Sequence, residues 1–187
     1  MSFETLKNRL PDFAKDLKLN ISSLLNETIL TDQQKYGVFL AAALAGQNAT
    51  VIQDVMADAN EYLSDDAITA VKTAHALMGM NNVYYRHLSS LTNDKELQTM
   101  PAGLRMNALT AHGNIEKADF EAYELAVSTI YACKMCVQAH ESGLLKEGFS
   151  KQQIQAIIRI SAVVHAVSVT LESEAALGNE AALSAAA

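Results

Sequence analysis

Two cysteines and a histidine in the last third of the chain have the spacing of a redox centre. Cys133 and Cys136 are the only cysteines among the 187 residues and form a C-x-x-C pair, and His140 follows Cys136 by four positions. On a helix all three side chains share one face, because residues three and four positions apart are neighbours there. A thiolate is the reactive form of cysteine, and an imidazole within reach can accept its proton. The spacing therefore predicts a redox dithiol with its own base.

Three other interpretations of the cysteine pair stay open at this point. A structural disulfide is one, although a three-residue step closes too small a loop to restrain the unfolded chain much. A zinc site is another, but zinc usually takes four ligands and only three candidates stand here. A pair of buried, unreactive cysteines is the third, since free cysteine is among the most buried residue types. The C-x-x-C spacing favours the redox interpretation, and we expect no metal.

Glu121 is a candidate for orienting the histidine. It lies twelve positions before Cys133 on a segment expected to be helical, and a bend before the dithiol would let its carboxylate reach His140. A carboxylate there would hold the imidazole and raise its basicity, although a solvated surface glutamate is the alternative interpretation. These residues alone do not decide which of the two thiols is the nucleophile. A helix N-terminus favours Cys133, whereas an imidazole one turn away favours Cys136.

The composition predicts an all-α protein with a single domain over residues 1–187. Strong helix formers abound, and the chain has only two prolines, eight glycines and no Trp. The net charge of −7 and the lack of a basic patch argue against nucleic-acid binding. The first residues lack the apolar core of a signal peptide. The longest apolar stretch, Ala156–Leu171, is interrupted by Arg159 and His165, so we expect a cytoplasmic protein with no membrane span.

Apolar spacing and capping residues predict where the helices lie. The first spans 2–19, is broken by Pro11, and buries a stripe that includes Phe13. The other expected helices are one beginning near Leu24, one capped by Thr31 that ends near Gly46, 49–62, 65–78 ending at Gly79, 81–91, a short one at 104–110, one opening at Lys117, the cysteine helix ending at Gly148, and 151–175 capped by Ser150. We expect a loop at 92–103, a turn at His112-Gly113-Asn114, and a frayed Ala-rich tail at 179–187.

The two halves of the chain resemble each other weakly. Leu40-Ala-Ala-Ala-Leu-Ala lies 85 positions before Leu125-Ala-Val-Ser-Thr-Ile, and Ser64-Asp-Asp-Ala-Ile lies 86 before Ser150-Lys-Gln-Gln-Ile. In this register Asn48 falls at Cys133. We interpret the pattern as an internal duplication with halves at about 1–95 and 96–178, of which only the second carries chemistry.

Several motifs together resemble one known family. They are Glu121-x11-Cys133-x-x-Cys136-x3-His140, Leu10-Pro-Asp-Phe-Ala-Lys-Asp, Met78-Gly-Met-Asn-Asn-Val-Tyr-Tyr-Arg, Gly103-Leu-Arg-Met-Asn and Lys117-Ala-Asp-Phe-Glu. This combination resembles the alkylhydroperoxidase D (AhpD) family of the carboxymuconolactone decarboxylase-like superfamily, over nearly the whole chain. Some members carry a histidine inside the C-x-x-C, where this chain has Lys134-Met135.

The resemblance implies an all-helical fold with two similar halves, a homo-oligomer that is typically a trimer, and a lipoyl-dependent reductase of organic hydroperoxides. It implies that Cys136 attacks the peroxide and becomes a sulfenic acid, while Cys133 is the proton donor and resolving thiol. His140 would be the base, and Glu121 would orient and deprotonate it. The redox disulfide would join Cys133 to Cys136.

The resemblance also implies the partners. We expect no bound cofactor; a reduced lipoyl group, the dihydrolipoamide of a 2-oxoacid dehydrogenase component, would reopen the disulfide by thiol–disulfide exchange. Electrons would pass on to the peroxiredoxin AhpC through a mixed disulfide at Cys136, as part of antioxidant defence.

Two other functions compete with this one. A decarboxylase of the wider superfamily would act on a lactone acid and would need no cysteine pair. A redox-sensing adaptor would oxidise stoichiometrically, without catalytic turnover. The remaining histidines do not cluster with the dithiol, and His165 is expected to be a core or interface group. Met78, Met80, Met100 and Met106 are expected to fill the core, and Tyr84 and Tyr85 to be core or interface aromatics.

Overall fold

The fold is assembled from helices. The computed structural model describes residues 2–91, 93, 95–110 and 113–178, and within these ranges it contains nine α-helices, two 3₁₀-helices and no strand. The elements are α1 (Phe3–Arg9), η1 (Asp12–Ala14), α2 (Lys15–Asn26), α3 (Asp32–Gly46), α4 (Ala49–Tyr62), α5 (Asp65–Leu88), α6 (Lys95–Thr99), η2 (Asn107–Thr110), α7 (Lys117–Ile130), α8 (Lys134–Lys146) and α9 (Lys151–Ala176). The expected all-α class is confirmed.

Helix α3 is the centre of the core. Its residues from Val38 to Ala43 are all completely buried, and it packs against α4, α5, α7 and α9. The segment is apolar on every side, as expected of a helix with no face toward water. Its alanines are small, so neighbouring helices approach closely on all sides. The capping box predicted at Thr31 is present and sets where α3 begins.

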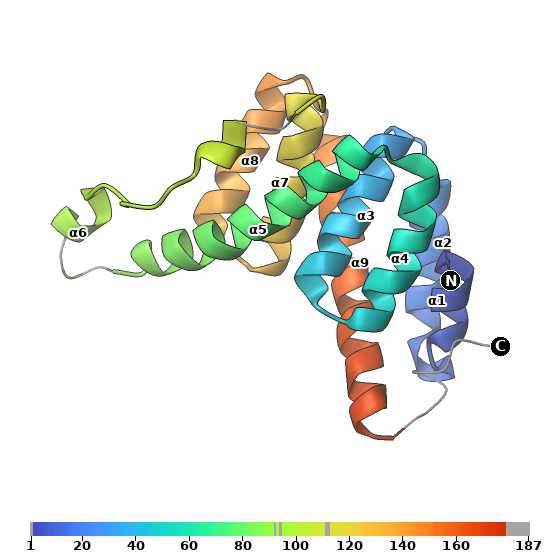
Figure 1. Ribbon diagram of the computed structural model, residues 1–187. Coiled ribbons are helices and arrows are strands. Elements are labelled where there is room, and N and C mark those ends of the chain that lie inside the picture. Colours follow the sequence, from blue (N-terminus) through green and yellow to red (C-terminus); the bar gives the residue numbers. More distant parts are fainter. Residues whose placement is uncertain (1, 92, 94, 111–112, 179–187) are drawn as a thin grey trace.

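The second half of α5 leaves this bundle and forms an arm that carries α6 (Figure 1). Helices α7 and α8 pack beside the base of the arm, while α1 and α2 lie on the opposite side of α3 and α9 (Figure 1). The functional residues proposed from the sequence therefore lie at the end of the molecule from which the arm projects.

Helices α3–α4–α5 and α7–α8–α9 follow the same order with nearly the same spacing in sequence. The junctions before α4 and α8 also match. Gln47 and Ala132 are the non-glycine residues with positive φ in the described chain, at 58° and 53°. The next residues, Asn48 and Cys133, each cap a helix by accepting a hydrogen bond from the backbone N–H three positions on, at 3.1 and 3.3 Å. A duplication of the chain remains a prediction that these matching bounds support.

Two expectations about the first helices are wrong. Phe13 is 78% exposed, because the break at Pro11 and the 3₁₀ turn after it rotate this residue away from the stripe that Leu6 and Leu10 bury. No new helix begins near Leu24, since α2 continues through this region and the Ser22 hydroxyl bonds back to the Lys18 carbonyl instead of capping.

Helix α5 also continues through Gly79, where the sequence predicts an end. A glycine inside a helix costs only about 1 kcal/mol relative to alanine. Burial of the apolar Met78 before Gly79, and the packing of α5 against α7 and α8, outweigh this cost. The expected loop at 92–103 contains the short helix α6, while His112 of the expected turn and the tail 179–187 lie outside the described residues.

Helix α9 is long and apolar enough to cross a membrane by length and composition. Half of its most apolar window is buried inside the bundle, against α3 and α7 among others. The core helix of a soluble protein has the same properties, so this feature gives little support to a membrane span.

Candidate active site

The turn between α7 and α8 places the two cysteines. Helix α7 ends at Ile130, and Ala132 turns the chain with a left-handed φ of 53°. Cys133 then caps α8, and its sulfur accepts a hydrogen bond from the Cys136 N–H at 3.3 Å. The bend that the sequence predicts before the dithiol is therefore present, and both sulfurs lie at the first turn of a helix, where the helix dipole favours a thiolate.

The two cysteines are joined by a disulfide, with Cα atoms 5.3 Å apart. They differ in access. Cys133 is completely buried, whereas Cys136 is 6% exposed and lines a cavity. A molecule in this cavity meets the Cys136 sulfur first.

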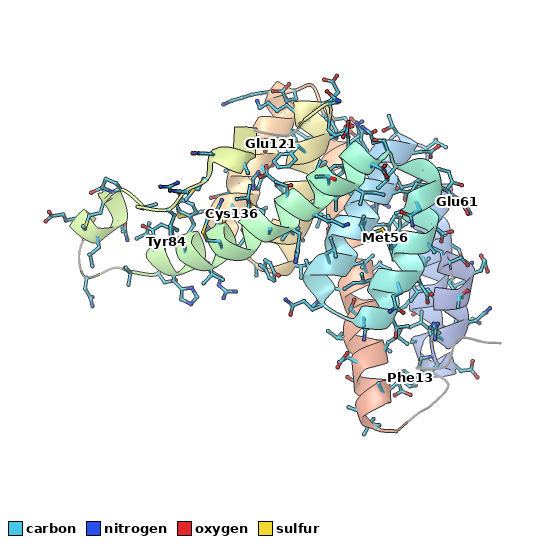
Figure 2. The ribbon with its side chains drawn as sticks, in the orientation of Figure 1. Phe13, Met56, Glu61, Tyr84, Glu121 and Cys136 are labelled. Carbon is cyan, nitrogen blue, oxygen red and sulfur yellow. A yellow bond between two sulfur atoms is a disulfide. The ribbon has the colours of Figure 1, made fainter. Side chains whose placement is uncertain are left out.

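The cavity has a volume of about 360 Å³ and lies between α5, α7 and α8. Glu121 on α7, Cys136 on α8 and Tyr84 on the arm of α5 all lie in this part of the molecule (Figure 2). The cavity wall combines polar or reactive residues with apolar ones. The polar or reactive lining residues are Asn81, Glu121, Glu124, Cys136 and His140, and the others are Met78, Tyr85, Met106, Met135 and Ala139. Such a wall suits a small molecule with an apolar body and one polar end.

Glu121 holds His140 as the sequence predicts. The Glu121 Oε2 atom lies 2.8 Å from Nδ1 of His140, which confirms the expected hydrogen bond. An ionised carboxylate only accepts, so Nδ1 carries the hydrogen and Nε2 is the nitrogen left to accept a proton. His140 and Cys136 line the same cavity, one helical turn apart on α8.

Gly143 makes room for Glu121. A Cβ atom at Gly143 would lie 3.0 Å from both Cδ and Oε2 of Glu121, closer than ordinary packing allows. Gly143 follows His140 by three positions and so shares its face of α8. Because Gly143 has no side chain, the Glu121 carboxylate can pack directly against α8 beside the His140 imidazole.

Glu124 is a site residue that the sequence does not single out. It is 3% exposed, lines the cavity, and its Oε2 lies 3.6 Å from the His140 Nδ1, while its Oε1 has no hydrogen-bond partner in the described chain. Burial, reinforced by the nearby Glu121 charge, raises the pKa of Glu124 to about 8. Glu124 therefore carries a proton at neutral pH. The sequence signal that could have identified Glu124 is its position three residues after Glu121, on the same face of one helix.

Glu121, Glu124 and His140 also bring one ligand atom each within 4.8 Å of one another, a spacing that could hold a metal ion. Metal binding requires deprotonated ligands, and the raised pKa of Glu124 opposes that state at neutral pH. The expectation of a site without metal remains a prediction.

The other histidines that the structure describes do not line the cavity. His75 is half-buried, and burial lowers its pKa. His165 is exposed on the outer face of α9, so it does not lie in the core, and the alternative that it is an interface group remains a prediction. Among the methionines, Met78 is buried as expected, but Met100 is 54% exposed because it follows α6 on the arm.

Fold and site together define an all-helical protein with a C-x-x-C disulfide beside a carboxylate-bound histidine. Residues 95–178 match the carboxymuconolactone decarboxylase family. The chain is also 53% identical to the alkyl hydroperoxide reductase AhpD of Hyphomonas neptunium, over 96% of this chain and 99% of that protein. It is 51% identical to the protein of the same name from Maricaulis maris, over 93% and 99% of the two chains. The chain belongs to the AhpD family.

Proposed function

We propose that this protein is a lipoyl-dependent alkyl hydroperoxide reductase. The observation that carries the proposal is the Cys133–Cys136 disulfide with Cys136 on the wall of a cavity beside the Glu121–His140 pair. The name alkyl hydroperoxide reductase, printed for relatives of 50% identity and more, gives independent support.

The cycle begins with both cysteines reduced. His140 accepts the proton of Cys136, and the resulting thiolate attacks the terminal oxygen of the hydroperoxide. Cys136 becomes a sulfenic acid and an alcohol leaves. Cys133 then attacks the Cys136 sulfur, its proton leaves with the hydroxyl as water, and the disulfide closes. Dihydrolipoamide reduces the disulfide and is itself oxidised to lipoamide.

Exposure assigns the attacking thiol to Cys136 in this proposal, because the cavity reaches Cys136 and Cys133 is completely buried. The same exposure makes Cys136 the sulfur for a mixed disulfide with AhpC, to which we propose that electrons also pass. The lipoyl group would belong to a component of a 2-oxoacid dehydrogenase in the cytoplasm.

We further propose that the protein forms a homotrimer. The arm offers a surface for self-association, since Val83, Leu97 and Met100 on and beside α5 and α6 are 52%, 43% and 54% exposed. A monomer mass by light scattering at micromolar concentration would contradict this assembly.

The proposed activity is tested by peroxide consumption with NADH, dihydrolipoamide dehydrogenase and a lipoyl carrier. We expect catalytic turnover in the wild type and none in Cys136→Ser. Stoichiometric oxidation without turnover would instead indicate a redox sensor, and activity on a lactone acid that survives loss of Cys133 would indicate a decarboxylase.

A dimedone-type probe separates the roles of the two cysteines. Cys133→Ser blocks disulfide closure, so peroxide should leave a sulfenic acid that the probe labels at Cys136. Labelling of Cys133 in Cys136→Ser, with none of Cys136 in Cys133→Ser, would reverse the assignment.

A further inference from the structure

Two buried oxygen atoms on the cavity wall have no hydrogen-bond partner among the residues that the structure describes. They are Oε1 of Glu124 and Oδ1 of Asn81, and their residues are 3% and 4% exposed. A buried polar atom without a hydrogen bond costs roughly 1–3 kcal/mol, so such atoms are uncommon. Two of them beside Cys136 indicate that a ligand supplies the missing hydrogen bonds.

The two groups offer complementary chemistry. The amide oxygen of Asn81 accepts a hydrogen bond, and a protonated Glu124 donates one. A hydroperoxide, R–O–O–H, needs this combination, because its terminal O–H donates and its inner oxygen accepts. The apolar lining residues, which include Met78, Met106 and Met135, are left to contact the R group.

We propose that Asn81 and Glu124 hold the hydroperoxide over Cys136, and that Glu124 donates the proton which the departing oxygen takes up. The inference rests on the proposed peroxidase function and names residues of the same site. Asn81 accepts the hydrogen bond of the terminal O–H, and Glu124 acts at the inner oxygen.

The step is balanced in atoms and electrons. An electron pair of the Cys136 thiolate forms the S–O bond to the terminal oxygen, and the O–O bond breaks with its pair on the inner oxygen. The proton of Glu124 moves to that oxygen and gives the alcohol, while the terminal oxygen keeps its hydrogen as the sulfenic acid. Glu124 then regains a proton from Nδ1 of the His140 imidazolium, which lies 3.6 Å from its Oε2. The proton taken from Cys136 stays on Nε2, and exchange with water returns the hydrogen to Nδ1, so that Nε2 can accept a proton in the next cycle.

Other groups are less suited to this transfer. Cys133, the proton donor that the resemblance implies, is completely buried and does not line the cavity. Besides Cys136, the titratable groups that share the cavity with Glu124 are Glu121 on α7, His140 on α8 and Tyr85 on α5. Glu121 and His140 bind each other, and His140 must accept a proton in the same step. The Tyr85 hydroxyl is directed at the Met106 sulfur, 3.9 Å away. The raised pKa of Glu124 is consistent with its role as the acid.

The leaving group provides the decisive test. An alkoxide leaving from tert-butyl hydroperoxide is a strong base and needs a proton, whereas acetate leaving from peracetic acid does not. The measurement is the rate at which pre-reduced protein loses its thiols with each oxidant, counted after rapid quenching. Glu124→Gln should slow the reaction with tert-butyl hydroperoxide by roughly 10²–10⁴, and the reaction with peracetic acid by far less.

Controls make the result unambiguous. The exposed Glu141 on α8 gives a matched variant, Glu141→Gln, which should leave both rates unchanged. Asn81→Leu keeps the size of the side chain but removes the acceptor, so it should slow both oxidants. An equal loss with both oxidants in Glu124→Gln, or no loss with either, would overturn the role of Glu124. A wild type that reacts with neither oxidant would instead refute the proposed function itself.

Discussion

Gly143→Ala is expected to weaken the proton relay from Cys136 through His140 to Glu121 without altering any of these three residues. The new Cβ would lie 3.0 Å from the Cδ of Glu121, whereas carbon atoms pack best at about 3.5–4.0 Å. The carboxylate must therefore move away from α8 by about 0.5 Å. Its hydrogen bond to His140, now 2.8 Å, would stretch to about 3.3 Å, beyond the usual range for N–H···O.

The expected cost is a tenfold loss of kcat/KM, on the order of 1.4 kcal/mol. Misplacement of a catalytic group by 1 Å can cost about 10²-fold, and the displacement here is about half of that. Stability should change little, because alanine gains about 1 kcal/mol over glycine within a helix and the tight contact offsets part of this gain. Peroxide turnover and thermal unfolding, measured on the same samples, separate the two effects.

Two comparisons test this reasoning about Gly143. In Gly79→Ala the added Cβ meets nothing within 4 Å, so that variant should gain about 1 kcal/mol of stability and keep full activity. If Gly143 acts only through Glu121, then Gly143→Ala should cost nothing more in a Glu121→Ala background, which lacks both the carboxylate and the tight contact. An equal loss in both backgrounds, or full activity of the single variant, would refute the explanation.

Three further predictions concern the core and the buried charges. Gly37→Ala should lower the Tm steeply in a thermal melt, because its Cβ would lie 2.2 Å from the Tyr123 ring. Arg9→Met should cost about 3–5 kcal/mol in urea unfolding, since it breaks the buried 2.8 Å pair with Asp54 and leaves that carboxylate without the arginine. The pKa of Glu124 is raised from 4.5 to about 8, so the native state binds the extra proton, and stability falls as the pH rises between these values. Glu124→Gln should remove that fall. The free energy of unfolding of the variant should equal that of the wild type below about pH 4.5 and exceed it by on the order of a few kcal/mol above pH 8. Equal unfolding curves at pH 9 would contradict this.

His140→Phe tests the base itself and also belongs to these predictions. General-base assistance is worth roughly 10²–10⁴ in rate, so the loss of peroxide turnover should be large. Glu121→Phe should lose less, because a histidine without its partner still accepts a proton. Full turnover in His140→Phe would show that the relay is wrong.

Local information determined most of the helices and the core of the relay. The caps at Thr31 and Ser150 could be predicted because a capping box needs only residues three positions apart. The shared face of Cys136 and His140 follows in the same way from helical spacing. The contact of Glu121 with His140 needed one further assumption, the bend at Ala132, which the structure contains.

Packing between distant segments decided the rest. Asn81 lies more than 50 positions before Cys136, and only the packing of α5 on α7 and α8 brings the two to one cavity. The burial of Glu124, and with it the raised pKa, likewise depends on neighbouring helices and not on its own sequence. The helix through Gly79 has the same cause, whereas the exposure of Phe13 follows from the local 3₁₀ turn after Pro11. Local preferences amount to about 1 kcal/mol per residue, and burial of side chains by other helices outweighs them.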